Sequence, residues 1–220
     1  MRTYLSPIGF NSTSVTRPVL SRGIDTGDTV VLIRPEKGSD NSRAEEALTD
    51  VERMLTEIEP DVSLKTERIP HDDFPTAVLA CSDVIRAAEP SRIVNLGGGA
   101  RDVLLPFAFA ATAHVPLLDT VLFFSDIDGT VREWELPRLT PVVEETTVDT
   151  LESIADVDDW VSIPDLTERT GQSKSTVTRH VTRLEQRGFV ETDTRGKTKF
   201  TRVTITGRLG TQVDTDFMDS

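Results

Sequence analysis

The sequence contains a single cysteine, Cys81, and only 5% of its 220 residues are aromatic. One cysteine excludes an internal disulfide framework and a cysteine-based zinc site, and we expect Cys81 to be a small buried hydrophobe in a helix. The longest apolar run, around residues 103–113, is too short to span a bilayer. The first residues also lack the apolar core of a secretory signal. These absences predict a cytoplasmic protein with no membrane segment and no metal site.

Lysine is also scarce, with five residues against nineteen arginines, and the net charge is -13. Aspartate, glutamate and threonine are abundant throughout the chain. This composition is typical of proteins from a high-salt cytoplasm, where acidic surfaces keep proteins hydrated. We therefore expect a halophilic source, and we attribute the negative charge to the solvent more than to the binding partner.

The positive charge that is present lies late in the chain. Residues 141–172 contain nine acids and one base, whereas residues 173–208 contain three acids and nine bases. An acidic protein that gathers its bases in one segment is expected to bind a polyanion there.

The first 136 residues alternate between strand and helix patterns. The predicted strands are Arg2–Leu5, Thr29–Arg34, Val62–Ile69, Arg92–Leu96, Pro116–Phe124 and Thr130–Leu136. The predicted helices are Phe10–Leu20, Ala44–Glu59, Phe74–Ala88 and Asp102–Ala113, of which the last is apolar nearly all round and is expected to be buried. Asp128-Gly129 marks a hairpin that adds an antiparallel strand. The pattern predicts an α/β fold with a Rossmann-like, mostly parallel sheet.

The pattern changes at a short connector between Pro137 and Pro141. We place a sensing and dimerisation domain at residues 1–138, a winged helix-turn-helix domain at 139–210, and a flexible tail at 211–220.

Residues 146–210 have the order helix, helix, helix, hairpin that is typical of a winged helix. Ser162 and Ser173 precede two of these helices as N-caps, Pro164 lies in a first helical turn, and Gly171 supplies the turn between them. The third helix, up to Arg187, is followed by the predicted strands Phe189–Asp193 and Lys199–Thr206. The segment resembles the winged-helix domains of archaeal and bacterial transcription regulators.

The third helix and the hairpin are predicted to bind double-stranded DNA. Small hydroxyls near the start of the helix allow close approach to the major groove, and Arg179 can reach a guanine edge or a phosphate. The basic hairpin tip suits phosphates or the minor groove. The predicted contacts are Ser173, Lys174, Ser175, Thr176, Arg179, Thr182, Arg183, Arg195, Lys197 and Lys199. A winged helix that makes only protein contacts is the alternative, and this grouping of bases argues against it.

Two polar loops follow the predicted strands Arg2–Leu5 and Arg92–Leu96. Loops at the carboxyl ends of parallel strands form ligand sites. Glycines allow close backbone approach, the following helix offers free N–H groups to an anion, and Arg101 adds a phosphate fork. The candidate residues that the two loops supply for a ligand are Ser6, Gly9, Phe10, Asn11, Thr13, Gly97, Gly98, Gly99 and Arg101. The fingerprint of a dinucleotide site is not matched, and the three glycines can also serve turn geometry alone.

Gly9-Phe10-Asn11 with Thr13, the later glycines with Arg101, and the winged helix together resemble the CRISPR-associated Rossmann-fold (CARF) regulators of archaea. The resemblance covers nearly the whole chain. It implies a homodimer that binds a cyclic oligoadenylate, often cyclic tetra-adenylate, across its two-fold axis, and that regulates CRISPR-associated genes. The resemblance also implies that the ligand contacts include Gly9, Asn11, Thr13, Gly98 and Arg101.

Two other functions stay open. The first is a ring nuclease that cleaves the cyclic ligand, although neither loop contains a lysine or histidine to act as a base. The second is a repressor that does not respond to oligoadenylate. We expect no catalytic residues, and we expect His114 and His180 to be structural or phosphate-facing.

Overall fold

The chain divides into two compact units in a computed structural model, Met1–Arg138 and Leu139–Ser220. The structure describes residues 1–36, 42–136, 142–157 and 159–212, and each unit is treated by itself. Among the described residues, no helix has the length and apolar character needed to cross a bilayer.

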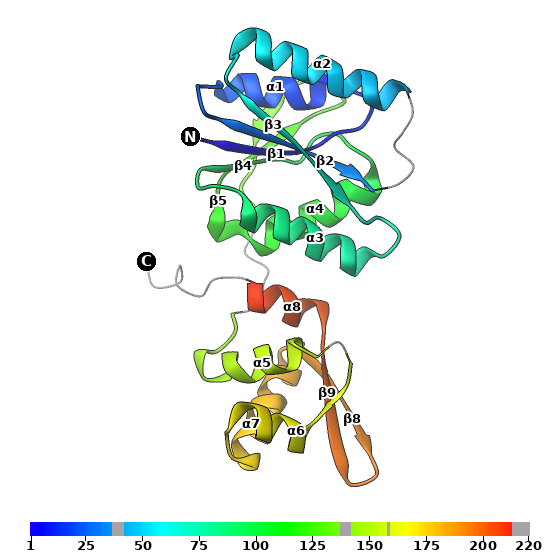
Figure 1. The fold of residues 1–220 in the computed structure, drawn as a ribbon, viewed down its shortest axis with the longest axis vertical. Coiled ribbons are helices and arrows are strands. Elements are labelled where there is room, and N and C mark those ends of the chain that lie inside the picture. Colours follow the sequence, from blue (N-terminus) through cyan, green and yellow to red (C-terminus); the bar gives the residue numbers. More distant parts are fainter. Residues whose placement is uncertain (37–41, 137–141, 158, 213–220) are drawn as a thin grey trace. The chain divides into compact units, whose positions relative to one another are not determined.

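The first unit is a sheet covered by helices on both faces (Figure 1). Helices α1 and α2 lie on one face, and α3 and α4 lie on the other. The elements of this unit, in chain order, are β1 Thr3–Pro7, α1 Thr13–Arg22, β2 Thr29–Pro35, α2 Ser42–Ile58, β3 Ser63–Ile69, α3 Phe74–Ala87, β4 Arg92–Asn95, α4 Arg101–Ala113, β5 Leu118–Phe124 and β6 Val131–Glu133, with a 3-10 turn at Val115–Leu117.

The six strands have the order β3-β2-β1-β4-β5-β6. Strands β1 to β5 are parallel, and β6 pairs with β5 in antiparallel fashion. All five residues of β1 are buried, as a central strand requires, whereas most of the edge strand β3 is exposed. The order confirms the predicted Rossmann-like fold. The direction in which successive strands are added also reverses between β1 and β4. This is the switch point where ligands bind in such sheets.

The predicted element bounds need small corrections. The first helix begins at Thr13, three residues later than predicted, because Phe10 to Ser12 form the loop after β1. The predicted strand Pro116–Phe124 begins only at Leu118, after the 3-10 turn. Strand β6 is limited to Val131–Glu133, although the N–H of Trp134 still donates to the carbonyl of Val121 on β5 at 2.9 Å.

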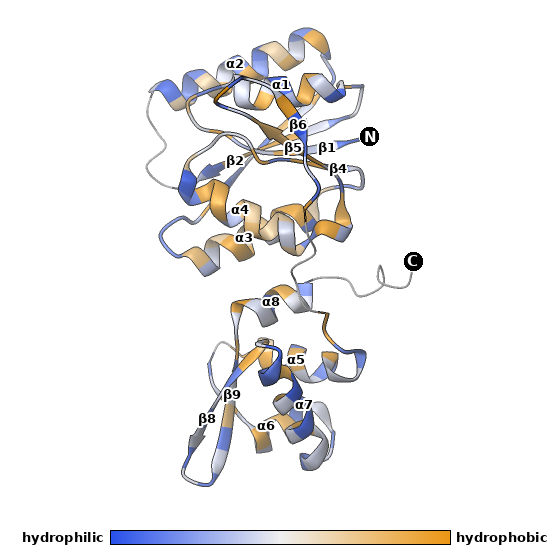
Figure 2. Cartoon of the chain, turned by 180° about the vertical axis from the view of Figure 1, so that it is seen from behind, coloured by the Kyte–Doolittle hydropathy of each residue, from blue (hydrophilic) through white to orange (hydrophobic). Residues whose placement is uncertain are grey.

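Helix α4 is not buried all round, contrary to the prediction. Leu105 and Phe109 are 53% and 59% exposed, whereas Phe107 is fully buried. Figure 2 shows that the hydrophobic colouring continues along most of the helix. One apolar face of α4 is therefore largely exposed in this unit.

The second unit is a winged helix, and it confirms the predicted order of three helices and a hairpin. Its elements are α5 Val148–Ala155, β7 Val161–Ser162, α6 Ile163–Thr170, α7 Lys174–Gln186, β8 Val190–Arg195, β9 Thr198–Val203 and α8 Ile205–Gln212, with a 3-10 turn at Glu145–Thr147. Strand β9 lies between β7 and β8 in a small antiparallel sheet.

The predicted helix caps are confirmed. The Ser162 hydroxyl accepts the backbone N–H of Asp165, and the Ser173 hydroxyl accepts that of Thr176, at 3.2 Å in both cases. Gly171 ends α6 in the left-handed conformation. These caps fix where α6 and α7 begin, and thereby which side chains α7 turns outward.

Two predictions for the C-terminal segment are wrong. Strand β9 ends at Val203, and the residues that follow form α8. The predicted tail at 211–220 begins inside this helix, because residues 211 and 212 are its last two. The rest of the predicted tail lies outside the described residues.

Candidate ligand site and nucleic-acid interface

The structure brings the two predicted polar loops together at the switch point. Strands β1 and β4 are neighbours, so the β1–α1 loop (residues 8–12) and the β4–α4 loop (residues 96–100) leave the same edge of the sheet. A Cβ placed on Gly9 would lie 3.4 Å from the Cα of Gly99. We call residues 8–12 and 96–100 the paired loops.

The glycines of the second loop are required by this close packing. Gly98 and Gly99 have φ angles of +84° and +83°. A Cβ on Gly98 would lie 2.2 Å from the Oγ of Ser14, and one on Gly99 would lie 2.6 Å from the Cβ of Pro7. The glycine run thus serves local packing, whether or not it also approaches a ligand.

Asn95 joins the paired loops from beneath and was not among the predicted residues. Its Nδ2 donates to the Oγ of Ser6 at 2.7 Å and to the carbonyl of Ser14 at 2.8 Å. Its Oδ1 accepts the N–H of Gly97 at 3.1 Å. A buried amide with several protein partners fixes the geometry of the groups that it joins. The signal in the sequence was an asparagine at the end of an apolar strand.

The predicted ligand contacts divide into an exposed set and a buried set. Asn11, Phe10 and Arg101 are exposed, and Gly9, Thr13, Gly98 and Gly99 are partly exposed. Ser6 is 1% exposed with its hydroxyl engaged by Asn95, and Gly97 is buried against Phe124. Ser6 and Gly97 therefore support the paired loops from inside, which corrects their predicted place on the ligand surface.

The start of α4 is suited to an anion. Its N-cap residue, Ala100, has no side chain that can cap the helix, so the first N–H groups have no side-chain acceptor. Arg101 follows as the first helical residue, and its exposed guanidinium has no partner among the residues that the structure describes. Phe10 adds an exposed ring on the other loop, with the guanidinium carbon of Arg43 at 5.4 Å from its centroid. Sequence reasoning missed Arg43.

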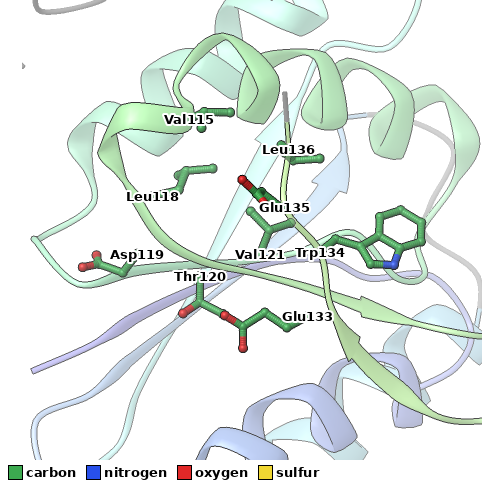
Figure 3. A pocket seen from close by; sticks show the side chains of 9 residues that line it. All are labelled: Val115, Leu118, Asp119, Thr120, Val121, Glu133, Trp134, Glu135 and Leu136. Atoms are coloured by element: carbon green, nitrogen blue, oxygen red, sulfur yellow. The ribbon is translucent and has the colours of Figure 1, made fainter. Parts of the chain in front are cut away.

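A separate pocket of about 720 Å³ lies beside β5 and the segment that follows β6 (Figure 3). It is lined by Val115, Leu118, Asp119, Thr120, Val121, Glu133, Trp134, Glu135 and Leu136. Its charged side chains are all acidic, so it would repel a phosphate ligand. The paired loops are therefore the better candidate for an anionic ligand.

Helix α7 presents one exposed polar side, which we call the recognition face. A shallow groove on it is lined by Lys174, Ser175, Thr178, Arg179, Thr182 and Arg183. Five of these are predicted DNA contacts, and Thr178 was missed although it lies four residues from both Lys174 and Thr182. The hydroxyls of Thr178 and Thr182 donate to the helix backbone at 2.8 Å and 2.9 Å. The recognition face therefore presents the methyl groups of these two threonines between Lys174 and Arg183, the cationic residues at its two ends.

The other predicted DNA contacts lie at the helix start and on the wing. Ser173 caps α7 and bonds Thr176, which is only partly exposed. Gly196 and Lys197 form the turn of the β8–β9 hairpin, and Arg195 and Lys199 flank that turn.

Acidic neighbours occupy several of the predicted DNA-binding bases. Arg183 pairs with Glu144 at 3.1 Å, Lys199 with Glu185 at 2.9 Å, and Arg195 with Asp193 at 2.9 Å. The guanidinium of Arg195 also lies over the rings of Trp160 and Phe200. By contrast, within the described ranges Lys174, Arg179 and Lys197 have no partner. The bases therefore form a paired group and a free group.

The two buried histidines are structural. His180 faces inward from α7, where its Nδ1 lies 2.8 Å from the Oγ1 of Thr150 on α5. Burial, followed by Arg179 and Arg183, lowers its pKa. His114 has its Nε2 at 2.6 Å from the Oγ of Ser82, and burial lowers its pKa to about 4. Neither histidine reaches a candidate site.

An α/β unit with paired loops at its switch point, followed by a winged helix with a basic recognition face, defines the class of two-domain DNA-binding regulators. Residues 2–135 match the Csa3 CRISPR-associated Rossmann-like domain, and residues 143–197 match the MarR family. The first match covers more than half of the chain, so the protein belongs to the Csa3 family of CRISPR-associated proteins. Together the matches indicate a CRISPR-associated DNA-binding regulator.

More distant likenesses were found among solved structures, whereas no curated protein matches. Reduced HlyU from Vibrio cholerae is 22% identical with a TM-score of 0.26, over 30% of this chain and 70% of HlyU. AF1382 from Archaeoglobus fulgidus is 22% identical with a TM-score of 0.30, and the match covers 38% of this chain and 99% of AF1382. Enterococcus italicus Csm6 bound to cyclic hexa-2'-fluoro-hexa-dAMP is 12% identical with a TM-score of 0.49, and the match covers 84% of this chain and 52% of Csm6. The family assignment therefore depends on the two domain matches.

Proposed function

We propose that this protein is a homodimeric regulator of CRISPR-associated genes that binds a cyclic oligoadenylate at its paired loops. Cyclic tetra-adenylate is the first ligand to test, because the resemblance to CARF regulators implies it. Ligand binding changes how the dimer engages double-stranded DNA through its two winged helices.

The observation that carries the ligand proposal is Arg101 at the start of α4. An unpartnered guanidinium beside an uncapped helix start provides charge and directed N–H donors for a phosphate. Asn11 and the exposed Phe10 ring lie on the adjoining loop, where they suit a ribose or a base. The same edge thus combines the contacts that a nucleotide ligand needs.

The exposed face of α4 supports a homodimer. Leu105 and Phe109 follow Arg101 at intervals of four residues, so the three share one side of the helix. Phe74 of α3 packs edge-on against Phe109 at 5.4 Å between ring centroids, and is itself 46% exposed. A two-fold axis beside this face would bury the apolar residues and bring two Arg101 side chains to one site. A cyclic ligand with two-fold symmetry would fit such a site.

Replacing Arg101 with alanine is expected to weaken the binding of cyclic tetra-adenylate by about 1.5–3 kcal/mol, because a hydrogen bond to a charged phosphate is lost. Thermal stability should stay unchanged, since Arg101 has no partner in the described protein. Isothermal titration calorimetry with the full chain measures the affinity. Arg53→Ala, which removes an exposed arginine from α2, is the control and should bind normally.

Three results would contradict the proposal in different ways. They come from the titration, from a DNA-binding assay and from inspection of the ligand after incubation with the protein. A wild-type protein that binds DNA but not cyclic tetra-adenylate would be a regulator that does not respond to this ligand. Linear oligoadenylate in the product would identify a ring nuclease. Equal affinities for Arg101→Ala and the wild type would show that the ligand binds elsewhere.

Arg179→Ala is expected to weaken binding to a preferred DNA sequence by about 1–3 kcal/mol, because Arg179 is the free arginine near the middle of the recognition face. The preferred sequence is obtained by selection from a random duplex pool, and both proteins are titrated on it and on random DNA. A loss confined to the preferred sequence identifies a base contact. An equal loss on both duplexes identifies a phosphate contact, and no loss on either would exclude Arg179 from the interface.

A further inference from the structure

An acidic side chain from the beginning of the winged-helix unit lies against α7, the helix that carries the recognition face. Glu144 is the first charged residue in the described part of the second unit, which begins at Val142. Its Oε2 lies 3.1 Å from Nη1 of Arg183, and its Oε1 lies 2.7 Å from Nη2 of Arg187. One carboxylate thus pairs with Arg183 in the last turn of α7 and with Arg187, the C-cap residue of the same helix.

The backbone holds Glu144 in this position independently of its side chain. Its carbonyl accepts the N–H of Thr147 at 2.7 Å and the Thr147 hydroxyl at 2.8 Å. Arg187 also donates to the carbonyl of Val142 at 2.9 Å, and Val143 is buried in the core of the unit. A change confined to the Glu144 carboxylate should therefore leave this turn in place.

The position of Glu144 is one that a DNA phosphate would otherwise take. Arg183 lines the recognition face, and Arg187 follows it by one helical turn. A carboxylate and a phosphate engage a guanidinium through the same type of charged hydrogen bond. The three side chains are 36–47% exposed, so each ion pair is weak and open to displacement.

We propose that Glu144 competes with DNA phosphates for Arg183 and Arg187, and so lowers the affinity of the recognition helix for DNA. The proposal rests on the DNA binding proposed above. It separates the cationic residues of α7 and its C-cap into two kinds. Arg179 and Lys174 are free to contact DNA at once, whereas Arg183 and Arg187 contact it only after Glu144 gives way. Glu144 therefore sets how many phosphates the helix neutralises.

The test compares Glu144→Gln with Glu145→Gln in the full chain. Both changes remove one negative charge, but Glu145 is exposed and has no basic partner in the described part of the chain. Binding is measured by fluorescence anisotropy on a random duplex of about 30 base pairs at about 50–200 mM salt. We expect Glu144→Gln to bind roughly three- to tenfold more tightly than Glu145→Gln. The slope of log K against log salt should steepen by about 0.9 for each phosphate gained.

A second comparison removes the two arginines. In an Arg183→Gln/Arg187→Gln background, Glu144→Gln and Glu145→Gln should have equal effects, because no competition remains. Thermal melting checks that every variant is folded. Equal effects of the two changes in the native background, or an unchanged salt slope, would overturn the competition. If the wild type binds no DNA at any salt, both the proposed DNA binding and the competition by Glu144 fail. If the wild type binds DNA but Glu144→Gln and Glu145→Gln have equal effects, only the competition fails.

Discussion

Gly98→Ala is expected to lower the free energy of unfolding of the first unit by about 2–5 kcal/mol and to abolish ligand binding. Two costs add. The φ angle of +84° disfavours any residue with a Cβ by about 1–2 kcal/mol. The new Cβ would also lie 2.2 Å and 2.7 Å from the Oγ and Cβ of Ser14, and overpacking of this kind costs about 1–3 kcal/mol. Relief requires the paired loops to separate, which would displace Arg101.

The control for this prediction is Gly27→Ala in the same unit. Gly27 has a φ angle of +86°, but a Cβ there would lie 3.4 Å or more from its nearest neighbours, which belong to the flexible Met1 side chain. It should therefore show the backbone cost without the packing cost. Urea unfolding followed by circular dichroism gives the two free energies, and calorimetry gives ligand affinity. If Gly98→Ala is no less stable than Gly27→Ala, the loops are not packed as closely as described.

The features of the fold that local sequence controls could be predicted. The Ser162 and Ser173 caps and the Gly171 turn depend on residues close in the chain, and each is found where expected. The meeting of the two polar loops could also be predicted, because parallel strands place their carboxyl ends at one edge. What a single sequence did not indicate was that Asn95 joins these loops, since its partners are up to 89 residues away.

Helix α8 shows tertiary packing overriding local propensity. Its sequence contains two glycines, which disfavour a helix, and the β-branched residues Ile205 and Thr206, which favoured our predicted strand. The glycines are needed by the packing, because a Cβ on Gly207 would lie 2.1 Å from the carbonyl of Phe189. The Thr204 hydroxyl also accepts the N–H of Gly207 at 3.1 Å and stabilises the first turn. Helix α8 therefore depends on contacts that form only once the β8–β9 hairpin has folded.

The charge pattern predicted where the bases lie but not which of them are free. Counting nine bases in residues 173–208 gave the predicted DNA-binding segment. Several of the acids that pair with them are distant in the sequence: Glu144 is 39 residues from Arg183, Glu185 is 14 residues from Lys199, and Glu191 is 11 residues from Arg202. Such pairs form only when the unit is folded, so a count of charges overestimates the positive field that DNA meets.

Phe109→Asp is expected to convert the proposed homodimer to a monomer and to reduce DNA affinity by about 100-fold or more. A carboxylate buried in an apolar interface, facing its own copy across a two-fold axis, costs several kcal/mol. DNA affinity falls because two linked winged helices bind neighbouring half-sites with a high effective concentration, and a monomer loses that gain. Sedimentation velocity measures the mass, and anisotropy on a selected duplex measures DNA affinity.

Met54→Asp provides the matched control, because Met54 is a 41% exposed apolar residue on α2, which covers the opposite face of the sheet (Figure 1). It should remain dimeric and bind DNA normally. A Phe109→Asp protein that is still dimeric would place the interface away from α4, and the two Arg101 side chains would then not share one site. A monomeric Phe109→Asp protein that still binds cyclic tetra-adenylate with wild-type affinity would separate ligand binding from dimerisation. If the dimer and the ligand affinity are lost together, the two functions use one face of α4, as the four-residue spacing of Arg101, Leu105 and Phe109 predicts.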